Sequence, residues 1–135
     1  MNELFKKLQI KEQTRFLVSG VPEELNKTFS QLGENADDPQ VIIAFFQDDA
    51  GVASAATLLK RHAKGDETLV WFCYPKKSSK RYKATIDRDH GWNPVLDLGW
   101  DGVRQVAVNE DWSALRFRPT SAIKNYTRKK RIGSD

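Results

Sequence analysis

The chain has 135 residues, of which 39% are hydrophobic and 30% charged, and its formal net charge is +4 at pH 7. This composition predicts one globular domain and excludes a chain that is disordered throughout. No apolar run approaches the roughly 20 residues that a membrane-spanning helix needs, and no apolar segment follows Lys6 and Lys7 as a signal peptide would require. With Cys73 as the one cysteine and no disulfide framework, we expect a cytoplasmic location.

The positive charge is concentrated at the C-terminal end. Residues 120–135 hold five of the 22 basic side chains and one of the 18 acidic ones, which leaves 17 of each sign in residues 1–119. We therefore predict a single α/β domain over 1–119 and a basic, mobile tail over 120–135.

Strands and helices alternate in the first half of the chain. The predicted elements are a short helix or turn in 1–10, a strand over 14–19, a helix from Pro22 to Gly33, a strand over 41–46, and a helix from Asp48 or Asp49 to about Lys64. The strand over 41–46 is apolar on both faces, which is typical of the interior of a sheet.

The stretch from Thr68 to Tyr74 predicts the central strand. All seven residues are apolar or β-branched and none is charged, so we expect cover on both faces. Pro75 ends the strand, because proline has no N–H to donate. A basic loop follows, with five cations in eight residues: Lys76, Lys77, Lys80, Arg81 and Lys83.

The second half ends in a predicted hairpin. Residues 85–98 suggest a helix interrupted near Gly91 and Pro94, and strands follow over 102–108 and 112–118. The short turn between these strands makes them antiparallel. The element order predicts a small three-layer Rossmann-like sandwich, with a mainly parallel sheet and a C-terminal antiparallel hairpin.

Ligands of such sheets bind at the carboxyl ends of the strands. The candidate ligand-binding residues at these ends are Gly20, Asp48, Asp49, Tyr74, Lys76, Lys77, Ser78 and Arg81. Lysines supply point charges and serines supply hydroxyl donors, which indicates an anionic small molecule or an acidic partner. A solvated loop is the simpler interpretation.

Other chemistries have less support in the sequence. The turn at Gly20 lacks the G-x-G-x-x-G pattern, and helix capping explains Asp48 and Asp49, so we predict no cofactor. Residues 87–90 (Asp-Arg-Asp-His) are of types suited to acid–base work, but we do not expect four adjacent side chains to aim at one centre. We expect helix capping by Asp87 and an ion pair between Arg88 and an acid. Two histidines and one cysteine, far apart in the chain, do not predict a zinc site.

Two further groups each have two interpretations. The four tryptophans either fill the core or line a groove, and Trp92 and Trp100 lie in a glycine-rich stretch where partial exposure is expected. The basic cluster Arg128, Lys129, Lys130 and Arg131 either binds nucleic acid in a salt-sensitive way or only keeps the chain in solution.

A longer pattern spans residues 41–118. Acids follow the strand over 41–46, Trp71 lies in a strand that closes on Pro75-Lys76, and Asp111-Trp112 precedes Arg116. In this order the chain resembles a family of small, uncharacterised bacterial conserved proteins. The resemblance implies a compact α/β domain similar to a truncated Rossmann-like methyltransferase core, and it implies no known activity.

The sequence thus favours a non-enzymatic binding module for an anionic small molecule or acidic partner. The alternative is a degenerate transferase that binds a nucleotide or S-adenosylmethionine through the Gly20 loop with Asp48 or Asp49. A second alternative is weak nucleic-acid binding through the tail.

Overall fold

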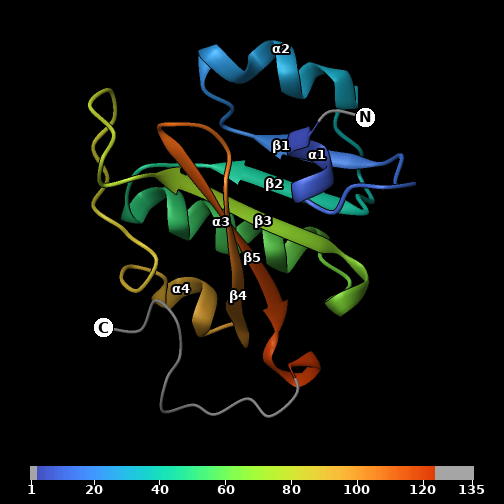
Figure 1. Ribbon diagram of the computed structural model, residues 1–135. Helices are drawn as coiled ribbons and strands as arrows, with labels where there is room; N and C mark the ends of the chain where they lie inside the picture. The colour runs from blue at the N-terminus through green and yellow to red at the C-terminus, as the bar shows by residue number, and fades with distance from the viewer. Residues whose placement is uncertain (1–2, 124–135) are drawn as a thin grey trace.

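The computed structural model describes residues 3–123, and these form an α/β fold around one mixed sheet (Figure 1). The strands are β1 (Phe16–Ser19), β2 (Val41–Phe45), β3 (Leu69–Pro75), β4 (Trp100–Ala107) and β5 (Trp112–Pro119). Their order across the sheet is β1-β2-β3-β5-β4. The central place of β3 is therefore confirmed.

Eight helical segments occur in the described residues. They are α1 (Glu3–Lys7), η1 (Glu23–Leu25), α2 (Asn26–Phe29), η2 (Ser30–Leu32), α3 (Asp49–His62), η3 (Gly65–Glu67), α4 (Asn93–Leu96) and η4 (Thr120–Ala122). The helix expected from Pro22 to Gly33 is thus three short pieces in succession. The folded part also continues past Pro119, since the backbone N–H of Thr120 donates to the Gly99 carbonyl at 2.7 Å.

The helix expected in residues 85–98 is largely wrong, because only α4 is helical there. Gly91 has a φ of +97°, which is outside the helical region, and a Cβ on it would lie 2.4 Å from a side-chain carbon of Ile86. The segment before α4 therefore turns tightly on itself, and this turn builds one wall of the candidate site.

The pairing of the strands corrects the expectation of a mainly parallel sheet. β2 lies parallel to both β1 and β3, with Val41 opposite Leu69. β5 lies antiparallel to both β3 and β4, so two pairings are parallel and two are antiparallel. The predicted hairpin of β4 and β5 is confirmed. Its second strand, β5, pairs with β3, so β5 is antiparallel to both of its neighbours.

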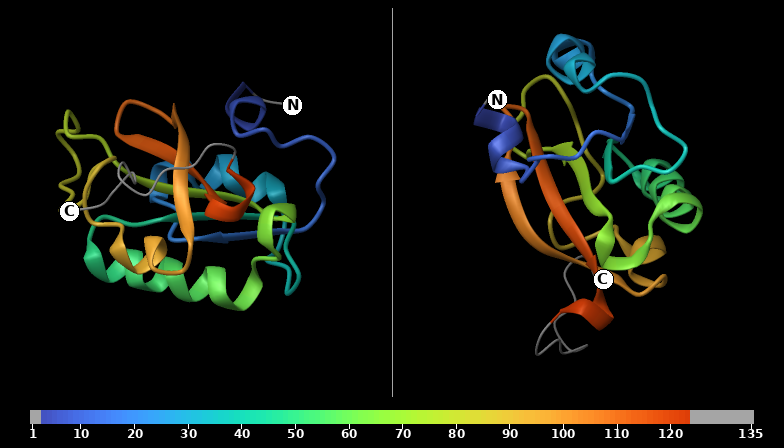
Figure 2. Two further views of the ribbon diagram at one scale, coloured as in Figure 1. Left: turned by 90° about the horizontal axis from the view of Figure 1, so that it is seen from below. Right: turned by 90° about the vertical axis from the view of Figure 1, so that its right-hand side faces the viewer.

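Each strand near the centre buries side chains on both faces, because successive side chains point to opposite sides of a sheet. Val70, Phe72 and Tyr74 pack with the apolar sides of α3 and α4, whereas Trp71 and Cys73 pack with α1, η1 and α2 on the other face. Figure 2 shows α3 and α4 together on one side of the sheet and α1 on the other. The sheet thus carries one hydrophobic core on each face.

The tryptophans belong to these cores. Trp92 is fully buried and Trp100 is 9% exposed, so the expected partial exposure of this pair is wrong. Burial also raises the pKa of the Cys73 thiol, which makes the side chain an inert part of the core. No helix within residues 3–123 has the length and apolar character to cross a bilayer.

Candidate functional site

The loop after β1 meets the end of β2 by close backbone contact. Gly20 has a φ of +70°, and a Cβ built on it would lie 2.3 Å from the Phe45 carbonyl oxygen. Only glycine fits this position without a shift of the backbone. The glycine is therefore explained by the packing of the loop after β1 against the end of β2.

The acids after β2 have local partners. Asp48 precedes α3 as its N-cap, and its Oδ1 accepts a hydrogen bond from the Gly51 backbone N–H at 3.0 Å. Asp49 Oδ1 accepts a long hydrogen bond of 3.5 Å from the Thr85 hydroxyl. The predicted capping role is confirmed for Asp48.

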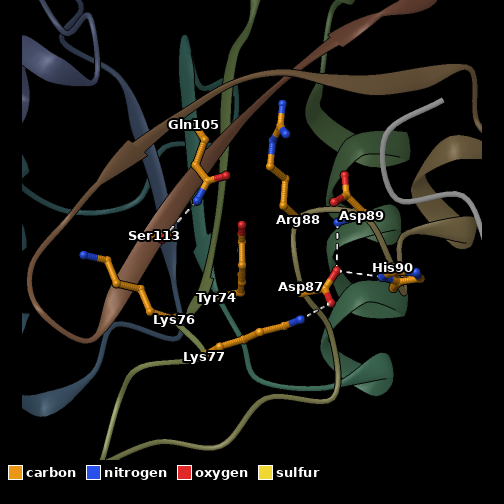
Figure 3. Close-up of a pocket in the computed structure, with 9 residues that line it drawn as sticks. All are labelled: Tyr74, Lys76, Lys77, Asp87, Arg88, Asp89, His90, Gln105 and Ser113. Carbon is orange, nitrogen blue, oxygen red and sulfur yellow. Dashed lines mark hydrogen bonds and ion pairs between the residues drawn. The ribbon is translucent and has the colours of Figure 1, made fainter. Parts of the chain in front are cut away.

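A cavity of about 280 Å³ opens at the end of β3 (Figure 3). Its walls come from the end of β3, from the turn over 87–90 and from the hairpin of β4 and β5. The lining residues are Tyr74, Lys76, Lys77, Asp87, Arg88, Asp89, His90, Gln105 and Ser113. We call this space the Tyr74 cavity, because Figure 3 shows the Tyr74 ring standing between the hairpin residues and Arg88.

The turn over 87–90 places all four of its residues along the lining of the Tyr74 cavity. Asp87 and His90 form an isolated antiparallel bridge, in which the Asp87 backbone N–H donates to the His90 carbonyl at 3.2 Å. The Asp87 carboxylate also accepts from the Asp89 backbone N–H at 2.8 Å, so it caps this turn and not a helix. The Trp92 indole N–H donates to the Asp87 carbonyl at 2.7 Å and ties the turn to the core.

Asp87 is the electrostatic centre of this wall. Its Oδ1 lies 2.9 Å from His90 Nδ1, and its Oδ2 lies 3.2 Å from the Lys77 ammonium. Burial by itself would raise the pKa of Asp87, but the hydrogen bonds from His90, the Asp89 backbone and Lys77 outweigh it and lower the pKa to about 2. The carboxylate therefore stays ionised and is matched by its own partners.

This depressed pKa predicts an acid-dependent loss of stability. The unfolded-state pKa of an aspartate is about 3.9, so the contribution of Asp87 is complete above about pH 4 and is lost as the pH falls toward 2. After allowance for partial solvent exposure, we expect Asp87→Asn to cost about 1 to 2 kcal/mol at pH 7 and to flatten the loss between pH 4 and 2. Urea unfolding of wild type and Asp87→Asn at pH 7, 4 and 2.5 measures this difference in the free energy of unfolding. Asp89→Asn, at the exposed neighbouring residue, is the control. If the free energy of unfolding changes equally with pH in wild type and Asp87→Asn, the result contradicts the assignment.

Unlike Lys77, two other cations of the cavity have no ion-pair partner among residues 3–123. Within residues 3–123, neither the Lys76 ammonium nor the Arg88 guanidinium lies within 4.0 Å of a carboxylate oxygen, so the expected ion pair of Arg88 is not found there. Burial raises the pKa of Tyr74 to about 12. Its hydroxyl is therefore protonated at neutral pH and is a hydrogen-bond donor.

Neutral polar groups complete the cavity on the hairpin side. The Gln105 side-chain amide donates to the Ser113 hydroxyl at 3.3 Å, and both residues line the cavity. The cavity thus combines two cations that have no carboxylate partner in the described chain with a tyrosine, an amide and a hydroxyl. This set of groups suits an anion.

The structure separates the other predicted site residues from the cavity. Ser78 is exposed and does not line it. Its neighbour Ser79 holds the loop, because its hydroxyl donates to Asp111 Oδ1 at 2.7 Å and accepts from the Tyr82 backbone N–H at 3.0 Å. Arg81 lies 3.8 Å from Glu24 and over the Tyr82 ring, away from the cavity lining.

Of the eight candidate ligand-binding residues, the cavity brings together Tyr74, Lys76 and Lys77. It does not include Gly20, Asp48, Asp49, Ser78 or Arg81. Gln105 and Ser113 were not predicted as site residues. The one signal for Ser113 is that a polar residue lies on the same face of β5 as the buried Leu115 and Phe117.

Comparisons with protein-family models, curated proteins and solved structures found no match for this chain. Within residues 3–123, no group of three or more histidine, cysteine or acidic side chains is placed to hold a metal ion. The basic cluster Arg128, Lys129, Lys130 and Arg131 lies outside the described residues.

Proposed function

We propose that the protein is a non-enzymatic binding module whose Tyr74 cavity receives an anionic group of a small molecule. The observation that supports this most directly is the presence of Lys76 and Arg88 on one small cavity, with no carboxylate of residues 3–123 within ion-pair distance of either. A bound anion would accept charge-assisted hydrogen bonds from both.

The carboxylates of the cavity do not cancel this attraction. Asp87 already forms an ion pair with Lys77 and a hydrogen bond with His90, and Asp89 is exposed to solvent. The protonated Tyr74 hydroxyl and the Gln105 amide add neutral donors. At about 280 Å³ the cavity is close to the lower limit for ligand sites, so it fits a single phosphate or carboxylate group with a small part of its carrier.

Titration of inorganic phosphate into the full chain at low salt tests the proposal. We expect NMR shifts at Lys76, Lys77 and Arg88, and we expect Lys76→Met to weaken binding about 10-fold to 100-fold, because a hydrogen bond to a charged group contributes about 1.5 to 3 kcal/mol.

The matched control is Lys80→Met, which removes an exposed cation of the same loop that does not line the cavity. We expect this variant to bind as wild type does. If the two lysine variants lose affinity equally, the attraction is a general effect of the basic loop. If phosphate shifts none of the cavity signals, the proposal fails.

We also propose that the fold is related to Rossmann-like domains and that the protein is cytoplasmic. The parallel β1, β2 and β3 with helical segments on both faces support the former, and the single buried free thiol of Cys73 supports the latter. The transferase alternative has less support, since contact with Phe45 explains Gly20 and helix capping explains Asp48.

A further inference from the structure

A second hollow adjoins the Tyr74 cavity. It has a volume of about 440 Å³ and is lined by Lys76, Lys77, Ser79, Tyr82, Lys83, Ala84, Thr85, Ile86 and Asp87. We call it the Lys83 hollow. Lys76, Lys77 and Asp87 line both spaces, so the two hollows lie on either side of a shared wall.

The two hollows each have a cation of their own. Arg88 lines only the Tyr74 cavity of this pair, and Lys83 lines only the Lys83 hollow. Like Arg88, the Lys83 ammonium has no carboxylate oxygen within 4.0 Å among residues 3–123. Lys76 lies between them and faces both spaces.

The Thr85 hydroxyl and an acid already paired with a lysine complete the Lys83 hollow. The Thr85 hydroxyl makes only a long contact of 3.5 Å to Asp49, so it is available as a donor to a ligand. Asp87 is the acid that lines the shared wall, and the Lys77 ammonium already balances its charge at 3.2 Å. Neither hollow therefore presents a strong barrier to an anionic group.

We propose that the physiological ligand is a small organic molecule with two anionic groups, one phosphate or carboxylate group in the Tyr74 cavity and the other in the Lys83 hollow. This inference rests on the proposed function, because it assumes that the Tyr74 cavity binds the first group. Lys76 is shared by both hollows, which makes them neighbouring sites that one small molecule with a group at each end can span. Once the first group is bound, the second binds at high effective concentration.

A matched pair of ligands tests this inference: fructose 6-phosphate and fructose 1,6-bisphosphate, which differ by one phosphate group. Calorimetric titration of the full chain is expected to show at least 10-fold tighter binding of the bisphosphate. Lys83→Met is expected to remove most of that advantage and to leave the affinity for the monophosphate unchanged. The NMR signals of Lys83 and Thr85 should shift with the bisphosphate and not with the monophosphate.

Lys80→Met controls for the greater charge of the bisphosphate, since it removes one positive charge of the same loop from outside both hollows. This variant should keep the full difference between the two ligands. Equal affinities for the two ligands, or an unchanged ratio in Lys83→Met, would overturn the inference of two anionic groups and leave the proposed function intact. Failure of both ligands and of inorganic phosphate to bind would overturn the two together.

Discussion

Replacement of Trp92 by alanine is expected to lower the free energy of unfolding by about 3 to 5 kcal/mol, as large aromatic truncations in a closed core do. The indole is fully buried at the centre of an aromatic cluster. Its ring neighbours, with centroids 5.0 to 6.4 Å away, are Phe46, Phe72, Tyr74 and Phe117. Removal of the ring leaves a cavity that these neighbours cannot fill by collapse, because Phe72, Tyr74 and Phe117 are held in β3 and β5.

The same indole also holds the candidate site, because its N–H donates to the Asp87 carbonyl at 2.7 Å. Trp92→Phe keeps most of the packing and removes this hydrogen bond, and we expect it to cost about 1 to 2 kcal/mol. Guanidinium unfolding measures both variants, and phosphate titration of the phenylalanine variant reports on the 87–90 turn. A loss below about 1 kcal/mol in Trp92→Ala would show that the cluster does not support the fold as described.

Replacement of Gly20 by alanine is expected to cost about 2 to 4 kcal/mol of stability, for two additive reasons. The residue has a φ of +70°, where a side chain strains the backbone, and the new methyl carbon would lie 2.3 Å from the Phe45 carbonyl oxygen. That oxygen belongs to the backbone of β2, so the contact is relieved only by a shift of the loop or of the strand.

Gly65 provides a control for this substitution. It also has a positive φ, +56°, but no atom lies within 4 Å of the position that its Cβ would take. Gly65→Ala therefore measures the backbone strain alone, which is about 1 to 2 kcal/mol. Equal losses in the two alanine variants would mean that the close approach to Phe45 does not exist in solution.

The candidate site was predictable where it follows a strong local signal. Lys76 and Lys77 come directly after an uncharged strand that a proline ends, and in an α/β sheet this is the edge where ligands bind. Asp48 was predictable as a cap because it immediately precedes an amphipathic run. These inferences need only the neighbouring residues.

The rest of the site depends on contacts between distant segments. Arg88 reaches the cavity because the 87–90 turn closes by hydrogen bonds and is held from behind by Trp92. Gln105 and Ser113 reach it because β5, and not β4, pairs with β3. The hydrogen bonds of the turn span only residues 87–92, but the packing of Trp92 against Phe72 and Phe117 and the pairing of β5 with β3 have no signature within a window of ten residues.

The amino-acid pattern by itself determined which segments form strands, that β2 and β3 are buried on both faces, and that the last two strands form a hairpin. Uncharged apolar runs and a short turn decide these features locally, through burial and chain connectivity. Only the tertiary structure decided that half of the sheet is antiparallel, that residues 85–92 form a turn, and which cations lack a carboxylate partner within residues 3–123. These features depend on packing between residues far apart in the chain, and the free energy of such contacts overrides the weak helix preference of the 85–98 segment.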